Sequence, residues 1–342
     1  MRVLVIQTAF LGDVILTLPM VQSVRRAMSG SEISFVAIPD TSEIVLSHPD
    51  ISDVVVYDKH GERKSFRSFL ALGRELRERE YDIVLCPHRS MRSCLLTKLS
   101  RAAIRIGFDN AALRSCFTHT LPWKFGVHEV DRDLSLLQPL GIEVRRDPPR
   151  LFPTGKQKDE AEKFLIEHEV KSPYAVIAPG TVWETKRYPL KMMALVAGKL
   201  LHKFTRVVIV GGKKDTVFVK ELTGIGRGIV SAVGELSIMS SAEIIRRASL
   251  LVANDSAPVH MASAFNVPTV AIFGPTVRDF GFFPYHKDSA VVEVDGLKCR
   301  PCSIHGTRRC PIGTFDCMKR IAPDEIVSRA FELLKIRNGQ ES

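Results

Sequence analysis

The chain has 342 residues and a net charge of +10, a length that favours two domains of roughly 150–170 residues each. Its composition, 45% hydrophobic and 25% charged, is that of a soluble globular protein. No apolar run reaches the roughly 18–20 residues that span a bilayer, and the seven cysteines do not suggest a secreted disulfide scaffold. The N-terminus reads as a strand rather than a secretory signal, so we expect a cytoplasmic protein.

Apolar runs that predict strands alternate along the chain with stretches that predict helices. Strands are predicted at residues 3–7, 33–38, 54–57, 83–86, 104–107, 174–178, 207–210, 250–253 and 269–273. Helices are predicted near residues 14–28, 65–80, 91–100, 190–203, 215–223, 241–248, 256–265 and 324–335. This alternation indicates parallel sheets with right-handed crossovers.

The predicted fold class is α/β, with two Rossmann-like domains whose parallel sheets face a central cleft. A Pro-rich, charged stretch at residues 143–160 marks the boundary, which gives domains at residues 1–155 and 156–342. In such folds the ligands bind beyond the carboxyl ends of the strands, so the loops there are the candidate sites.

The first such loop, within TAFLGDVILTLPM at residues 8–20, lacks the features of a phosphate site. A strand, a glycine-containing loop and a helix normally place phosphates at the helix N-terminus. Here a single glycine, Gly12, is followed by Asp13, whose carboxylate would repel a phosphate. Asp13 is therefore either a helix N-cap or a group that faces a ligand.

Two loops of the second half have the features of a nucleotide site. In APGTVWETKRYP, residues 178–189, Thr181 and Thr185 offer hydroxyls and Lys186 and Arg187 offer charge. In NDSAPVHMASAFNVPTVAIFGPT, residues 254–276, a serine after the strand is expected to cap a helix whose N–H groups can face an anion. The alternatives are a capped helix start with solvated basic residues, and a histidine at position 260 that is merely buried.

Residues 59–105 hold much of the excess positive charge, with twelve Lys and Arg against five acidic residues. This region is either a solvated helix face or a surface for an anionic partner: nucleic acid, acidic lipid or a phosphorylated glycan.

Four segments together resemble the bacterial lipopolysaccharide heptosyltransferases, glycosyltransferase family nine. They are QTAFLGDVILTLP (7–19), APGTVWETKRYP (178–189), NDSAPVHMASAFNVPTVAIFGPT (254–276) and LKCRPCSIHGTRRCPIGTFDCM (297–318). The resemblance extends nearly end to end and implies a GT-B fold. The last segment is most similar to the heptosyltransferase II subgroup.

The resemblance implies an inverting transferase in lipopolysaccharide inner-core biosynthesis. Such an enzyme moves L-glycero-D-manno-heptose from ADP-heptose to the first heptose of heptosyl-Kdo2-lipid A, at the cytoplasmic face of the inner membrane. Residues 1–155 would bind this anionic, lipid A-linked acceptor and residues 156–342 the ADP-heptose donor. No cofactor and no metal are implied, and peripheral membrane contact is expected.

The family's site residues carry over position by position. Asp13 matches the catalytic base, and Lys186 matches the lysine that binds the diphosphate and assists catalysis. The other donor-binding matches are Thr181, Leu236, Asp255, Ser256, Ala257 and His260. Family members often have Thr-Gly where this chain has Ser256-Ala257, and alanine adopts unusual backbone angles less easily than glycine.

These roles suit the chemistry of a single displacement. Such a reaction needs one carboxylate to take the acceptor's proton and no second carboxylate as nucleophile. A helix N-terminus favours the ionised form of Asp13, and Lys186 with helix-end N–H groups can stabilise the departing ADP. For the acceptor's acidic groups we expect contacts from four basic residues of the 59–105 region: Lys64, Arg67, Arg89 and Arg92.

Cys299 and Cys302 have the spacing of a metal-binding pair, whereas Cys310 and Cys317 do not. The four cysteines are therefore either a structural zinc site or packing residues that are reduced or redox-labile.

Three other functions are alternatives to the type II heptosyltransferase. A heptosyltransferase I or III type would use a different acceptor. An NAD-dependent oxidoreductase would need G-x-G-x-x-G after the first strand, and the chain lacks that pattern there. A nucleic-acid-binding protein could use the basic 59–105 region, but only 7% of the residues are aromatic and no known module is recognised. We therefore expect no nucleic-acid partner, and the oligomeric state is unknown.

Overall fold

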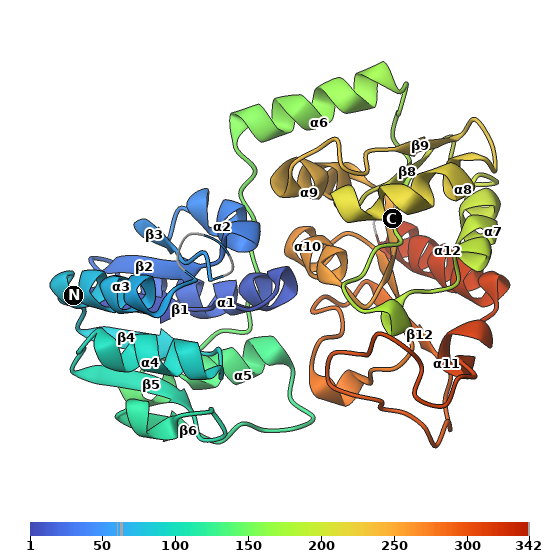
Figure 1. The fold of residues 1–342 in the computed structure, drawn as a ribbon. Helices are drawn as coiled ribbons and strands as arrows, with labels where there is room; N and C mark the ends of the chain where they lie inside the picture. The colour runs from blue at the N-terminus through green and yellow to red at the C-terminus, as the bar shows by residue number, and fades with distance from the viewer. Residues whose placement is uncertain (60, 62–63, 341–342) are drawn as a thin grey trace. The chain divides into compact units, whose positions relative to one another are not determined.

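The computed structural model describes residues 1–59, 61 and 64–340, with side chains described as far as residue 336. The chain divides into two compact units, Met1–Phe152 and Pro153–Ser342 (Figure 1). The division falls three residues before the boundary that the sequence suggests. A Thr154 cap and the helix that follows it open the second unit.

The described part of the first unit contains a six-stranded parallel sheet in the order β3-β2-β1-β4-β5-β6. β1 is central and buried almost throughout, because its Val, Leu and Ile side chains fill both faces of the sheet. The strands are β1 Arg2–Ile6, β2 Glu32–Ala37, β3 Asp53–Val56, β4 Ile83–Cys86, β5 Ile104–Phe108 and β6 His119–Leu121.

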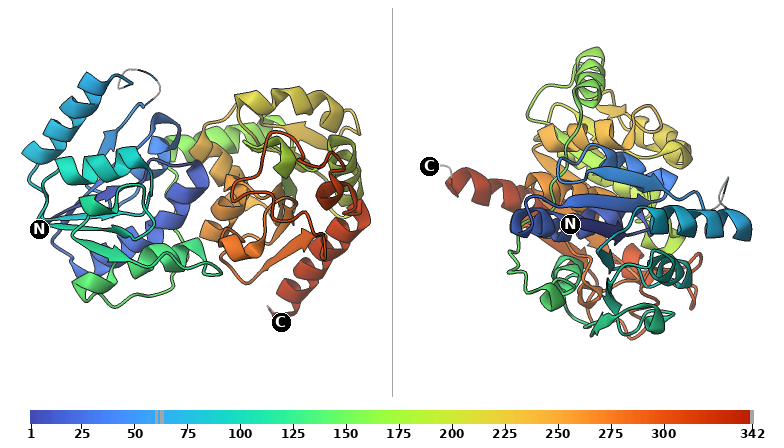
Figure 2. Two further views of the ribbon diagram at one scale, coloured as in Figure 1. Left: turned by 60° about the horizontal axis from the view of Figure 1, so that its bottom comes forward. Right: turned by 90° about the vertical axis from the view of Figure 1, so that its left-hand side faces the viewer.

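Helices cover both faces of this sheet (Figure 1). α1 is buried along most of its length, because it packs between the sheet and α5. α3 buries one stripe, Phe69, Leu72 and Leu76, and packs beside α4 (Figure 2). The helices are α1 Leu11–Ala27, α2 Pro39–Leu46, α3 Phe66–Glu78, α4 Met91–Leu99 and α5 Glu129–Ser135, with short turns η1 Arg114–Cys116 and η2 Gln138–Leu140.

The described part of the second unit contains another six-stranded parallel sheet, in the order β12-β11-β10-β7-β8-β9. Its strand β7 occupies a central position beside β10, as β1 does beside β4 in the first unit, and both sheets are doubly wound in the Rossmann manner. The strands are β7 Ala175–Ala178, β8 Val207–Ile209, β9 Ile229–Ser231, β10 Leu250–Asn254, β11 Thr269–Phe273 and β12 Ser289–Glu293.

The helices of the second unit pack on this sheet around a core of Ile, Val, Leu and Met side chains. α12 lies against α7 and the β10–β12 side of the sheet. The helices are α6 Gly155–Glu167, α7 Leu190–Leu200, α8 Val219–Thr223, α9 Ile238–Arg247, α10 Ala257–Phe265, α11 Asp316–Lys319 and α12 Pro323–Gln340, with short turns η3 Glu184–Lys186, η4 Lys213–Phe218 and η5 Arg278–Phe280.

These two sheets confirm the predicted α/β class with two Rossmann-like domains. The nine predicted strands all occur, with ends shifted by at most one residue. The helix expected at 215–223 is divided into η4 and α8, and α9 begins at Ile238, three residues before the predicted start. Ser237 caps α9 by accepting from the Ser240 N–H, which explains the earlier start.

Candidate functional site

Each sheet has a switch point where the strand order reverses, between β1 and β4 in the first unit and between β7 and β10 in the second. Ligands of doubly wound sheets bind beyond the carboxyl ends of the strands at such points. The candidate residues with predicted catalytic roles follow these strands: Asp13 follows β1 and Lys186 follows β7.

Asp13 is half-buried in the first turn of α1. The N-cap of this helix is Phe10, so the alternative that Asp13 is itself the N-cap is wrong. Two buried carboxyls of α5, those of Glu129 and Asp133, lie within electrostatic reach of Asp13. Burial raises the pKa of Glu129 to about 7, and the adjacent Arg132 opposes this rise in part.

Hydrogen bonds join the loops that follow β1 and β4. Thr8 Oγ1 lies 3.0 Å from His88 Nδ1 and 3.2 Å from Ser93 Oγ. Lys59 Nζ donates to the Thr8 carbonyl at 2.8 Å, and burial, with a contribution from Arg92, lowers the pKa of Lys59. Lys59 was not singled out beforehand, because nothing in its local sequence distinguishes it from the other basic residues of its region.

The four predicted acceptor-binding residues occupy two places. Arg89 lies in the loop after β4, with its Cζ 4.6 Å from the centre of the Trp123 ring. Arg92 lies in the first turn of α4 and donates from Nη1 to Tyr57 Oη at 3.2 Å. Lys64 and Arg67 are exposed, one just before α3 and one in its first turn.

In the second unit, three loops at the carboxyl ends of strands converge on one carboxylate. Lys186 Nζ lies 2.7 Å from Asp255 Oδ2, and Thr276 Oγ1 donates to the same oxygen at 2.7 Å. The Lys186 and Asp255 side chains are only 14% and 5% exposed. The predicted diphosphate lysine is therefore held by an ion pair, and Thr276 is a member of the group that sequence reasoning did not single out.

The loop that carries Lys186 is fixed on both sides. Asn254 accepts from the Tyr188 N–H at 3.0 Å and donates to the Pro179 carbonyl at 2.7 Å. Thr185 donates from Oγ1 to the Thr307 carbonyl and accepts from the Thr307 N–H, both at 2.8 Å. The Thr185 hydroxyl is thus used within the protein, not left for a ligand.

Thr181 and Leu236 belong to neighbouring loops of the second unit. Thr181 donates from Oγ1 to the Trp183 carbonyl at 2.6 Å, which shapes the loop after β7. Leu236, half-buried, lies in the loop between β9 and α9, at the same end of the sheet.

Asp215 accepts from the Gly212 N–H at 2.9 Å, and a Cβ on Gly180 would lie 2.4 Å from the Asp215 carboxylate. Gly180 therefore allows the β7 and β8 loops to approach closely.

α10 presents its N-terminus beside Asp255. Ser256 is the N-cap residue, but its hydroxyl donates to the Asn254 carbonyl at 3.2 Å, so the predicted side-chain cap is wrong. Ala257 begins the helix without a positive φ, so alanine in place of glycine does not strain this position. His260 is buried one turn further on.

The cysteine segment supports the Lys186 loop. Gly306, at φ +86°, packs against Lys186, and a Cβ there would lie 3.0 Å from Lys186 Cγ. Among the described residues, all seven cysteines are free thiols, and no group of three or more His, Cys, Asp or Glu has an arrangement suited to a metal ion.

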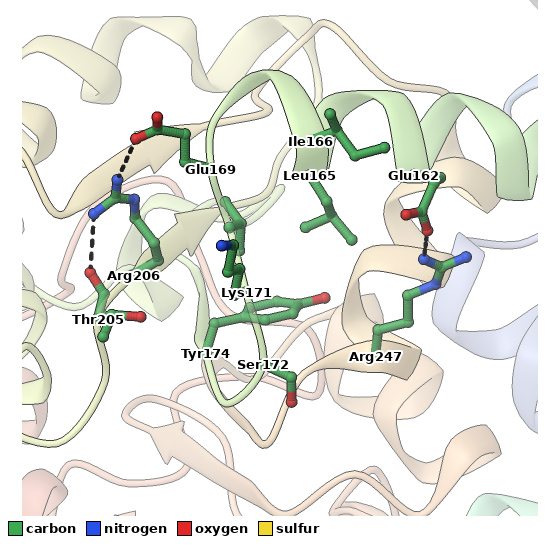
Figure 3. Close-up of a pocket in the computed structure, with 11 residues that line it drawn as sticks. Glu162, Leu165, Ile166, Glu169, Lys171, Ser172, Tyr174, Thr205, Arg206 and Arg247 are labelled. Atoms are coloured by element: carbon green, nitrogen blue, oxygen red, sulfur yellow. Dashed lines mark hydrogen bonds and ion pairs between the residues drawn. The ribbon is translucent and has the colours of Figure 1, made fainter.

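A separate hollow of about 710 Å³ lies at the amino ends of the second unit's strands (Figure 3). Tyr174, just before β7, lines it, together with Arg206 and Arg247, which pair with Glu169 and Glu162. This is the opposite end of the sheet from Lys186, so the hollow is not part of the candidate site.

No helix in the part of the chain that the structure describes is both long and apolar enough to cross a bilayer.

Two Rossmann-type units, each with a doubly wound parallel sheet, are the architecture of GT-B glycosyltransferases. Residues 69–311 match the sequence profile of Glycosyltransferase family 9 (heptosyltransferase). The chain belongs to this family. The predicted membership of this family and the predicted class of enzyme, a glycosyltransferase, are both confirmed.

The chain is 28% identical over 317 residues to "Lipopolysaccharide heptosyltransferase 1" of Pseudomonas aeruginosa, covering 88% of this chain and 86% of the relative. It is 27% identical over 283 residues to "Lipopolysaccharide heptosyltransferase 3" of Escherichia coli, covering 79% and 83%. These two relatives have type 1 and type 3 names, so similarity does not single out the predicted type II.

Solved structures share the fold. A family 9 glycosyltransferase from Veillonella parvula superimposes with a TM-score of 0.89 at 24% identity, covering 98% of this chain and 97% of the other. The ADP-heptose lipopolysaccharide heptosyltransferase II of E. coli gives 0.80 at 21% identity, with coverages of 99% and 100%.

Proposed function

We propose that the chain transfers L-glycero-D-manno-heptose from ADP-heptose to the first heptose of heptosyl-Kdo2-lipid A, in lipopolysaccharide inner-core biosynthesis. The observation that carries this proposal is the Lys186–Asp255–Thr276 group at the switch point of the second unit, in a member of the heptosyltransferase family. ADP as the nucleotide is supported by the family and by the structurally similar E. coli enzyme, an ADP-heptose heptosyltransferase.

The donor binds the second unit in this proposal. Lys186 and the first N–H groups of α10 meet the diphosphate, since the first N–H groups of a helix have no acceptor within the helix. Thr181 and Leu236 belong to neighbouring loops and complete the donor site, with Leu236 beside the adenine. Four residues shape the start of α10: Asp255, Ser256, Ala257 and His260.

The reaction is a single displacement with inversion. Asp13 takes the proton from the attacking acceptor hydroxyl, whose oxygen forms a bond to the anomeric carbon of the heptose. The bond from that carbon to the diphosphate oxygen breaks, and ADP leaves with the electron pair. Lys186 and the α10 dipole stabilise the negative charge that develops on the leaving group.

The acceptor binds the first unit, where its acidic groups meet Lys64, Arg67, Arg89 and Arg92. The same unit contacts the cytoplasmic face of the inner membrane. The support for membrane contact is the outer face of α3, on which the apolar Phe66 and Leu70 are exposed beside Arg67. Apolar side chains flanked by basic ones suit an anionic lipid surface.

A type I or type III heptosyltransferase is the alternative within the family, since relatives with type 1, type 3 and type 2 names are 28%, 27% and 24% identical to this chain. The alternatives differ in the acceptor, so an acceptor series distinguishes them. Purified protein would be incubated with ADP-heptose and Kdo2-lipid A, heptosyl-Kdo2-lipid A or diheptosyl-Kdo2-lipid A, and products would be identified by mass spectrometry.

We expect a gain of one heptose on heptosyl-Kdo2-lipid A. A gain on one of the other two acceptors alone would replace the type II proposal by another subtype. Calorimetric titration with ADP, UDP, GDP and NAD, without added metal, would run alongside, and selective ADP binding is expected. NAD binding, or no nucleotide binding, would contradict the transferase proposal itself.

A further inference from the structure

The hydroxyl of Thr17, one turn beyond Asp13 in α1, has three polar neighbours. Thr17 Oγ1 lies 2.9 Å from the Asp13 carbonyl, 2.7 Å from Asp133 Oδ2 and 3.1 Å from Gln7 Nε2. A hydroxyl has one proton to donate and two lone pairs to accept with. The Asp13 carbonyl is only an acceptor, and the Gln7 amide nitrogen is only a donor.

The proton count distinguishes two states of Asp133. If Asp133 is ionised, the single Thr17 proton goes either to Asp133 Oδ2 or to the Asp13 carbonyl, so one of these two oxygen–oxygen contacts, at 2.7 and 2.9 Å, has no proton. If Asp133 is protonated, it donates to Thr17, and the hydroxyl then donates once and accepts twice. All three short contacts are satisfied only in this second arrangement.

We propose that Asp133 is a neutral carboxylic acid that holds the first turn of α1 through Thr17 and thereby positions Asp13. Asp133 is a positioning residue in this role, since it does not itself touch the reacting groups. The inference rests on the proposed function in one respect, the assignment of Asp13 as the base.

The surroundings of Asp133 agree with a neutral acid. Its side chain is 0% exposed, and its Oδ1 is a buried oxygen with no hydrogen-bond partner within the described structure. An unpartnered oxygen costs far less in a neutral acid than in a carboxylate. Burial, and then the neighbouring Glu129, raise the pKa of Asp133 well above its ordinary value, although the hydrogen bond with Thr17 and the charge of Arg132 oppose the rise.

The charged groups that face Asp133 come from two helices, α1 and α5. Asp13 on α1 and Glu129 on α5 oppose a second negative charge there, whereas Arg132 on α5 favours one. Arg132 is engaged by an ion pair with Glu129, and it stacks on Trp123 with its Cζ 4.1 Å from the ring centre. Arg89, in the loop after β4, faces this pair.

The neutral state of Asp133 matters for the ionisation of the proposed base, Asp13. A base must be ionised when the acceptor arrives, and a second carboxylate nearby disfavours ionisation. A neutral acid gives the catalytic turn a strong hydrogen-bonded anchor without adding such a charge. Asparagine has the same shape and can donate from Nδ2 to Thr17 as a neutral acid does, and its Oδ1 can accept as a carboxylate does. The activity of this variant therefore tests the anchor, and the infrared band described below tests its charge.

The test compares Asp133→Asn with Asp133→Leu in the full-length protein. Asp133→Asn should keep the kcat of heptose transfer within about threefold, with an unchanged pH profile. Asp133→Leu should lower kcat roughly 10–100-fold, since the turn that carries Asp13 loses its anchor, and should leave ADP affinity unchanged. Equal loss of kcat in both variants would overturn the proposal.

A second measurement does not depend on activity. At pH 8 the infrared difference spectrum of wild type minus Asp133→Asn should contain the C=O band of a protonated carboxyl. The folded chain then keeps a proton that the unfolded chain loses above the ordinary pKa of 3.8, so wild-type stability should fall relative to Asp133→Asn as the pH rises.

A carboxylate band instead, with no change of relative stability, would overturn the proposal. If the wild type transfers no heptose but the protonated band is present, the proposed function fails and the neutral acid stands.

Discussion

Asp255 accepts from both Lys186 Nζ and Thr276 Oγ1 with one oxygen, Oδ2, each at 2.7 Å. The ammonium group is therefore held in place before any diphosphate arrives. Donors that are already oriented need little reorganisation during a reaction, which makes their electrostatic stabilisation effective. Because Asp255 offsets part of the lysine's charge, the α10 N–H groups must share the diphosphate in the proposed site.

His48, two residues after α2 ends at Leu46, makes the stability of the first unit depend on pH. Its ring is 2% exposed and packs edge-on to Phe152 at 4.9 Å between ring centres. Burial, and then Arg150, lower the pKa of His48 to about 4 from an ordinary value of 6.5. A lowered folded pKa means that its contribution to stability is complete above pH 6.5 and is lost as the pH falls towards 4.

We expect this loss to reach about 3 kcal/mol at most. The matched variant is His48→Asn, whose amide oxygen can accept from the Asp50 N–H as His48 Nδ1 does at 3.2 Å. Urea unfolding would be followed by Trp123 fluorescence in a Trp183→Phe background, from pH 7.5 down to 4.5. As the pH falls, the wild type should lose more stability than His48→Asn. If the stabilities of the two proteins change with pH in parallel, His48 is not the source of the pH dependence.

At the scale of an element, α3 has two faces with different roles. Phe69, Leu72 and Leu76 are buried in the first unit's core. On the outer face Phe66 is 72% and Leu70 is 42% exposed, one turn apart. We therefore expect α3 to bind vesicles that contain anionic lipid, with each nearby Lys or Arg contributing about 1 kcal/mol.

The variant Phe66→Ser/Leu70→Ser should bind vesicles of phosphatidylglycerol and phosphatidylcholine more weakly than the wild type in a sedimentation assay. The matched control is Ile166→Ser, which removes an equally exposed apolar side chain, 67%, from α6 of the other unit. Vesicles of phosphatidylcholine alone should bind little of any form. An equal loss in the control, or no preference for anionic vesicles, would remove α3 from the membrane proposal.

At the scale of the whole molecule, the strands were predictable in outline because buried parallel strands are apolar runs, such as IVLC in β4. The edge strands β6 and β12 were not predicted. β6 is HTL, with two exposed polar residues and no apolar run, and β12, SAVVE, has an apolar run of only three residues, Ala-Val-Val. α5 was missed because a helix of seven residues with four charges, EVDRDLS, shows little periodicity.

Candidate residues can be singled out from the sequence where they belong to a local motif after a predicted strand, and the structure places Asp13 after β1 and Lys186 after β7. The candidate site was not predictable where a role depends on a distant partner. Asp133 meets Thr17 across 116 residues, and Thr307 meets Thr185 across 122. Each of these contacts is made by the fold, and the local sequence around either residue contains no sign of it.

In the proposed reaction, the base and the lysine that stabilises the leaving ADP belong to different units. Asp13 belongs to Met1–Phe152 and Lys186 to Pro153–Ser342, where Asp255 of the same unit holds the Lys186 ammonium. Asp13→Ala should therefore abolish heptose transfer and leave the Kd for ADP within a few-fold of wild type. Lys186→Ala should weaken ADP binding at least about tenfold, because a charged hydrogen bond to the diphosphate is lost.

The double variant makes this separation quantitative. With independent units, Asp13→Ala/Lys186→Ala should bind ADP no more weakly than Lys186→Ala alone, since effects at independent sites add. Calorimetry on the four forms measures this directly, and circular dichroism checks that each is folded. Loss of ADP binding in Asp13→Ala alone would mean that this carboxylate supports the donor site, and the base of the proposed reaction would have to be sought elsewhere in the first unit.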